Sequence, residues 1–183
     1  MQELARRLSA CGFLVELPGD FRALQWTKLI LNLSNALGAL TDMPTRDLLF
    51  RGEYRRSMAA VMKEALGVLR SAGIEPARLG GAVPVRMFPL MLSLPTPLLK
   101  LVARAQIKID PKARSSMWED LSKGRLTEVD QLNGEIVRTA ESCGIDAPCN
   151  RRIVTLIHEA EKKGQGSPKL SADALWTELH RRS

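Results

Sequence analysis

The sequence predicts an all-α fold on three observations. Residues 53–72 carry apolar side chains at the three- and four-residue spacing of a helix that packs one face on a core. Glycine, which readily adopts the left-handed backbone found just past helix ends, follows predicted helices at Gly73 and Gly124. No segment alternates apolar and polar residues as a half-buried strand does, and no internal repeat is present. We therefore expect a multi-helical domain.

The predicted elements have recognisable ends. Asp20 and Thr127 are residue types that cap helix N-termini, Pro44 and Thr45 begin a short turn, and 75–84 is loop-like. In order, helices are predicted over residues 2–11, 21–40, 53–72, one or two within 90–105, 115–123, 128–142, 148–163 and 171–182. The candidate core comprises Met58, Val61, Met62, Ala65, Leu66, Leu69, Val129, Leu132, Ile136 and Ala140.

Length and composition indicate one domain and a tail. The chain has 183 residues, of which 45% are hydrophobic and 26% charged, so it can bury an ordinary core. A shift to glycine, glutamine, serine and proline at 164–168 marks a linker. We predict a helical domain over 1–165, and over 166–183 a linker with a helical tail that docks loosely or not at all.

Charge and cysteine content argue against several classes of protein. The 27 basic and 20 acidic residues give a net charge of +7 that is scattered over almost every helix, without the basic stripe typical of a nucleic-acid binder. Three unpatterned cysteines and two distant histidines indicate a reduced, metal-free, cytoplasmic protein. The longest apolar run, 87–99, is too short for a membrane span and is interrupted by prolines. We expect neither nucleic acid nor a membrane as a partner.

A polar stripe marks the helix predicted after Asp20. Lys28, Asn32 and Asn35 are spaced so that they share one side of a continuous helix, while leucines and Ile30 surround them. A lysine on such an apolar helix needs either a partner or a function. A purely structural interpretation is also open, in which the Lys28 ammonium reaches solvent and the two amides bind neighbouring loops.

Four motifs occur in an order and spacing that resemble one family over about residues 1–165. They are Trp-x-Lys-x-x-x-Asn-x-x-Asn at 26–35, Ser-Ser-Met-x-x-Asp-Leu at 115–121, Gly-Arg-x-Thr-Glu-Val-Asp-x-Leu-Asn-Gly at 124–134, and Gly-Ile-x-Ala-Pro-x-Asn at 144–150. Together they resemble the C-terminal domain of the ketopantoate reductase (2-dehydropantoate 2-reductase) family. The resemblance implies a helical domain like that of 6-phosphogluconate dehydrogenase, packed on an N-terminal Rossmann domain that binds NADPH.

The resemblance also implies roles that suit the reduction of a 2-keto acid. Hydride goes to the carbonyl carbon while negative charge grows on oxygen, so a proton donor beside that oxygen lowers the barrier. Lys28 would be that donor, or the cation that stabilises the alkoxide, and Glu128 would accept from the substrate hydroxyl or orient Lys28. Asn32 and Asn35 would position polar groups of the substrate, and Ser116 would bind its carboxylate. The residues that contact the cofactor stay unassigned.

Each of these residues also has a structural interpretation. Ser115 and Ser116 could cap a helix, Glu128 could favour a helix N-terminus, and Gly134 could permit close packing. The joint occurrence of the motifs in the family's order favours a site. The chain departs from some members at Ala36 and Ala113, where they carry asparagines, so the identity of the keto acid is left open.

A dinucleotide-binding segment is missing from the sequence. Gly80 and Gly81 lie in a proline-bounded loop without the third glycine or the preceding strand of a Rossmann turn. We expect this chain alone to bind no cofactor and to have no reductase activity, as an excised piece or a truncated gene product would.

Three hypotheses for function remain, in order of preference. The first is the substrate-binding and catalytic-acid part of an NADPH-dependent 2-keto acid reductase, acting on ketopantoate in pantothenate biosynthesis or on a related acid. Its partners would be the keto acid and the Rossmann domain. If the protein forms a homodimer, a second copy of the chain would be a further partner. The second is a non-catalytic helical module for dimerisation or binding. The third, ranked last, is a basic nucleic-acid binder.

Overall fold

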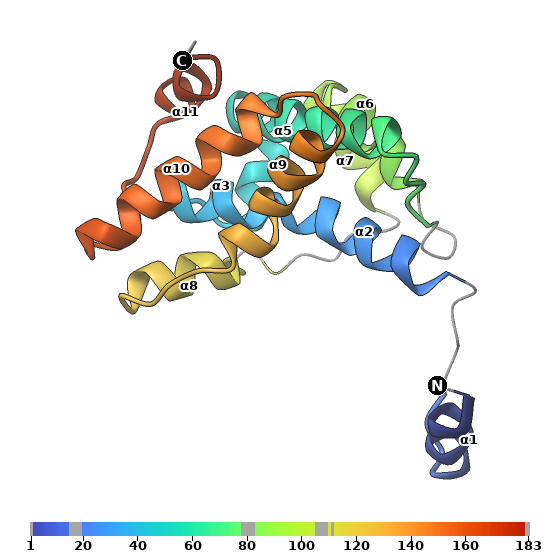
Figure 1. The fold of residues 1–183 in the computed structure, drawn as a ribbon. Helices are drawn as coiled ribbons and strands as arrows, with labels where there is room; N and C mark the ends of the chain where they lie inside the picture. Colours follow the sequence, from blue (N-terminus) through green and yellow to red (C-terminus); the bar gives the residue numbers. More distant parts are fainter. Residues whose placement is uncertain (1, 15–19, 78–82, 105–109, 111, 182–183) are drawn as a thin grey trace.

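A computed structural model describes residues 2–14, 20–77, 83–104, 110 and 112–181. These residues form helices, turns and loops, without a β-strand, so the predicted all-α class is confirmed (Figure 1). Within these ranges, no helix combines the length and the apolar character that crossing a lipid bilayer requires.

The polar stripe lies on two helices rather than one. Asp20 caps α2 (Phe21–Asn32) as predicted, its Oδ1 accepting from the Ala23 amide at 2.9 Å. The prediction of one helix through residue 40 is wrong at Leu33, where a turn separates α2 from α3 (Ser34–Thr41). The Ser34 hydroxyl donates to the Leu31 carbonyl at 3.1 Å, a side-chain contact of the kind that bends helices.

The long helix α5 (Gly52–Ser71) is the centre of the bundle. It contacts α4 (Thr45–Phe50), α6 (Phe88–Leu92), α9 (Asn133–Ser142), α10 (Pro148–Lys163) and α11 (Ala172–Leu179). Its predicted inner face is buried except for the partly buried Leu66. Gly73 follows its end with φ +67°. The turn predicted at Pro44 and Thr45 is instead the start of the short helix α4.

The proline-containing middle of the chain forms three short pieces. They are a 3-10 turn, η1 (Val85–Met87), followed by α6 and α7 (Thr96–Arg104). The buried Arg55 of α5 donates to the Leu94 carbonyl at 2.8 Å and to the Thr96 hydroxyl at 3.2 Å, which holds the link between α6 and α7 against the core. Much of the loop predicted over 75–84, namely 78–82, lies outside the described residues.

The helix predicted from residue 128 to 142 is interrupted near its start. The Thr127 hydroxyl accepts from the Val129 amide at 3.2 Å, and this begins only a single 3-10 turn, η2 (Val129–Gln131). The backbone then leaves helical geometry at Leu132 (φ −108°, ψ −84°), and α9 starts at Asn133. Glu128 therefore precedes a 3-10 turn. The prediction that it lies in the first turn of a long helix is wrong. The burial of Val129, Leu132, Ile136 and Ala140 is nevertheless as expected.

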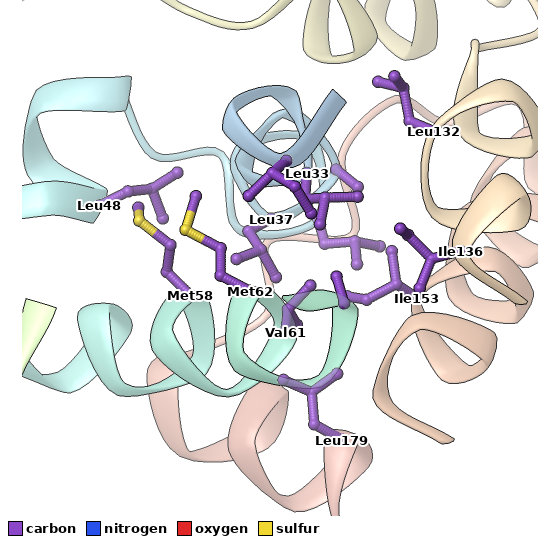
Figure 2. Packing of buried hydrophobic residues seen from close by; sticks show 14 of the residues in the cluster. Leu33, Leu37, Leu48, Met58, Val61, Met62, Leu132, Ile136, Ile153 and Leu179 are labelled. Carbon is purple, nitrogen blue, oxygen red and sulfur yellow. The ribbon is translucent and has the colours of Figure 1, made fainter. Parts of the chain in front are cut away.

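The core is shared by both halves of the chain. Figure 2 shows Leu33 and Leu37 of the α2–α3 segment facing Val61 and Met62 of α5, with side chains from the later helices closing the cluster. The segment around α8 (Ser116–Ser122) packs on α3. Residues from both halves thus bury one continuous cluster, which fixes α2 relative to η2.

The two terminal helices differ in how they pack. In α11, Leu175 is fully buried, so this helix is docked rather than loose, although the predicted division of the chain at residue 165 stays a prediction. In α1 (Gln2–Ala10), Leu4 remains 56% exposed, and the helix stands apart from the others in Figure 1. α1 therefore adds nothing to the core.

Candidate functional site

An open pocket of about 620 Å³ lies beside α2. Its size falls within the range of roughly 300–1,000 Å³ typical of sites for small molecules. Most of its lining is aliphatic or aromatic, with four polar side chains set among them. The lining residues are Phe21, Leu24, Gln25, Lys28, Leu29, Leu31, Asn32, Glu128 and Leu132.

Lys28 and Asn32 reach the pocket because the opposite face of α2 is anchored. Trp26, Thr27 and Ile30 are buried, and the Thr27 hydroxyl donates to the Ala77 carbonyl at 2.9 Å, which fixes the rotation of the helix. The four-residue spacing then places Lys28 above Asn32 on the pocket side. Lys28 is exposed and Asn32 half-buried, so neither side chain is sealed in the core.

The carboxylate of Glu128 faces the same pocket from the other half of the chain. Its Oε1 accepts a hydrogen bond from the Ser116 hydroxyl at 2.9 Å, which brings the predicted Ser116 to the edge of the site. Ser116 is the first residue of α8, and Ser115 caps that helix by accepting from the Trp118 amide at 3.2 Å. Two segments far apart in sequence, at 116 and 128, are thereby joined at α2.

Asn35 is the predicted site residue that the fold places elsewhere. It lies on α3, beyond the turn at Leu33, and it does not line the pocket. Its main-chain carbonyl accepts from the Ser115 hydroxyl at 2.9 Å. The described contact of Asn35 is therefore with the N-terminus of α8, whereas the predicted single stripe would have put its side chain on the same side of the helix as Lys28, two turns further along.

The pocket holds opposite charges without joining them in an ion pair. Lys28 forms no ion pair with any carboxylate that the structure describes, although Glu128 lines the same cavity. An ammonium group with donors free and a carboxylate nearby can bind a small anionic molecule that carries a hydrogen-bonding oxygen. Across the described part of the chain, no group of three histidine, cysteine or carboxylate side chains is arranged to hold a metal ion.

Several contributors to the site were missed in the sequence. Gln25 precedes Lys28 by three residues and so shares its side of α2, a spacing that could have revealed it. Leu29 was assigned to packing, and Phe21 and Leu24 were given no role, yet all three line the cavity. Phe21 is 54% exposed. An exposed aromatic next to a cavity is recognisable only once the cavity itself is known.

Solved structures of two enzymes share this fold. A PanE/ApbA family ketopantoate reductase from Ralstonia eutropha is 33% identical, with a TM-score of 0.68 over 90% of this chain and 49% of that one. D-mandelate dehydrogenase, solved with NADH and anilino(oxo)acetate, has a TM-score of 0.67 over 88% of this chain and 61% of the other; at 22% identity it supports the fold alone. The class is therefore an all-helical domain with the fold seen in that ketopantoate reductase.

Within that class, the chain belongs to one family. The family model described as ketopantoate reductase PanE/ApbA C terminal matches residues 20–161. A 2-dehydropantoate 2-reductase from Archaeoglobus fulgidus is 26% identical over 159 residues, which make up 86% of this chain and 47% of that protein. The chain spans about half the length of the curated relatives it matches, and it corresponds to the C-terminal part of the family.

Proposed function

We propose that this chain is the substrate-binding and catalytic-acid part of an NADPH-dependent 2-keto acid reductase, with ketopantoate as substrate and pantoate as product. The observation that carries the proposal is the shared pocket: Lys28 and Asn32 from α2 line it together with Glu128, which is hydrogen-bonded to Ser116. The names of the relatives supply the substrate class, since they are 2-dehydropantoate 2-reductases.

The residues of the pocket suit both ends of a 2-keto acid. The Lys28 ammonium donates to the keto oxygen and transfers a proton to it as the carbon is reduced, so that oxygen becomes a neutral hydroxyl beside an uncharged amine, while the product keeps its carboxylate. When the substrate binds, the Ser116 hydroxyl turns its single hydrogen from Glu128 to the substrate carboxylate, and Asn32 donates to the remaining oxygens. Glu128 accepts from the hydroxyl of the substrate. The apolar lining, including Leu29, excludes water from the reacting carbon.

The hydride donor is NADPH, which supplies a hydride to the carbonyl carbon when bound. We propose that a preceding Rossmann domain holds it and that this chain alone is inactive. The openness of the pocket supports this proposal, since Phe21 at its rim is exposed and leaves one side accessible to a second domain. A cytoplasmic location and, for the whole enzyme, a homodimer belong to the same proposal.

Lys28 provides the direct test. The chain is fused behind the nucleotide-binding domain of the Ralstonia eutropha reductase, and NADPH oxidation is followed with ketopantoate. Lys28→Ala is expected to lower kcat at least 100-fold, because general-acid catalysis contributes roughly 10²- to 10⁴-fold. Lys28→Arg distinguishes a proton donor from a stabilising cation. Arginine keeps the positive charge but does not release its proton at neutral pH, so the Lys28→Arg enzyme stays slow if Lys28 is the acid.

Lys63→Ala is the matched control, since Lys63 is an exposed lysine on α5 that does not line the pocket. It should leave kcat unchanged. A Lys28→Ala fusion as active as its parent, or a parent fusion that oxidises no NADPH, would instead favour the non-catalytic binding module. The exposed leucines Leu90, Leu98 and Leu101 are the observation that supports that second candidate.

A further inference from the structure

Asp42 accepts three hydrogen bonds at the C-terminal end of α3. It follows the last residue of α3 and has a left-handed backbone, with φ 59°. Its Oδ1 accepts from Arg114 Nη1 at 2.6 Å and from Trp118 Nε1 at 2.7 Å. Its main-chain oxygen accepts from the same Arg114 nitrogen at 2.7 Å. The Arg114 guanidinium lies over the Trp118 ring, 4.2 Å from its centroid, so the three side chains hold one another.

The two donors to Asp42 lie on either side of Ser116. Arg114 comes two residues before this serine and Trp118 two residues after it. The Asp42 carboxylate therefore binds the chain on both sides of Ser116. The stretch has further attachments to the same part of the fold. The Ser115 hydroxyl donates to the Asn35 carbonyl at 2.9 Å, and the Thr45 amide donates to the Ala113 carbonyl at 3.0 Å.

These contacts restrict where the Ser116 side chain can point. With the adjacent Ser115 turned to α3 and the next residue, Met117, fully buried, the Ser116 hydroxyl points outward to Glu128. Both Ser116 and Glu128 are exposed, so burial does not hold them in place. The direction of their hydrogen bond depends on how α8 is held against α3.

We propose that Asp42 is a positioning residue for the pocket: through Arg114 and Trp118 it sets the direction of the Ser116 hydroxyl, and through that hydroxyl the position of the Glu128 carboxylate. The effect on substrate depends on the proposed function. The effect on the Ser116 and Glu128 pair does not depend on it, and the two can be measured separately.

The left-handed backbone of Asp42 decides which substitutions are informative. Alanine would add strain at φ 59°, whereas glycine and asparagine tolerate it. Asp42→Gly removes the side-chain acceptor without that strain and keeps the main-chain oxygen that accepts from Arg114. Asp42→Asn keeps an oxygen that can accept from both donors but removes the charge, so it is the conservative rescue. Asp120→Asn is the control, because Asp120 lies on α8 but pairs with Arg125 at 2.7 Å, away from α3.

The test uses isotope-labelled chain and nuclear magnetic resonance. One measurement is the nuclear Overhauser effect between the Ser116 and Glu128 side chains; the other is the dissociation constant for ketopantoate from chemical-shift titration. Asp42→Gly is expected to abolish the Overhauser effect and to weaken ketopantoate binding about tenfold, the ratio that corresponds to one hydrogen bond of about 1.4 kcal/mol. Asp42→Asn should recover most of both, and Asp120→Asn should match the parent.

An Asp42→Gly chain that keeps both the Overhauser effect and the affinity would overturn the proposal. Should that variant fail to fold, Trp118→Phe decides, because it keeps a ring beside Arg114 and removes only the indole donor: the same losses support the proposal, and unchanged values overturn it. If the parent chain binds no ketopantoate, the proposed function fails, while the Overhauser measurement still decides whether Asp42 positions the pair.

Discussion

Single side chains connect helices that are distant in the sequence. Glu64 of α5 accepts at the N-terminus of α10 from the Cys149 amide at 2.9 Å and from the Asn150 amide at 2.8 Å. It also accepts from the Asn150 side chain at 2.8 Å, and Asn150 in turn accepts from Asn133 at 3.0 Å. Burial and the neighbouring Glu64 carboxylate raise the pKa of the Cys149 thiol to about 12, so this cysteine stays protonated at neutral pH.

Removing the Glu64 carboxylate should destabilise the fold. Glu64→Ala leaves two main-chain amides of α10 without their acceptor and removes one of two acceptors of the buried Asn150 side chain, so the free energy of unfolding should fall by about 2 kcal/mol. Urea titration followed by circular dichroism measures it. Glu75→Ala is the matched control, because among the described residues Glu75 pairs with the exposed Arg86, and its loss should change stability by less than about 1 kcal/mol. Equal losses in both variants would contradict the capping role.

At the level of the helices, the glycines divide by backbone geometry. Gly67 lies within α5, exposed, and a Cβ there would meet nothing within 4 Å. Gly73, just past the same helix, has φ +67°, which side chains rarely adopt. Gly67 thus weakens α5 although there is room for a side chain, whereas Gly73 allows the chain to turn away from the helix end.

Alanine should have opposite effects at these two positions. Gly67→Ala should raise the free energy of unfolding by about 1 kcal/mol, because the helix interior loses the entropic cost of glycine. Gly73→Ala should lower it by about 1 kcal/mol, because alanine is strained in the left-handed region. Thermal unfolding of both variants beside the parent measures the difference. Melting temperatures that shift in the same direction would show that backbone geometry does not control stability at this helix end.

For the whole molecule, the two terminal helices make unequal contributions. Leu175 of α11 is fully buried against the core, whereas Leu4 of α1 is 56% exposed. Leu175→Ala should therefore cost about 2–5 kcal/mol, the usual range for a buried leucine. Leu4→Ala should change stability by less than about 0.5 kcal/mol. Chemical unfolding of the two variants measures this contrast, and a small loss for Leu175→Ala would return residues 166–183 to the loosely docked tail first predicted.

Periodicity and motif spacing alone determined the all-α class, most helix positions, the inner face of α5 and the family, because these depend on local backbone preference and on residue order. The tertiary structure decided where the long helices break, at Leu33 and Leu132, and that Asn35 does not line the pocket. It also decided that α11 docks, and that Asp42 meets both neighbours of Ser116. Such outcomes depend on contacts between segments far apart in the chain, which have no periodic signature in the sequence.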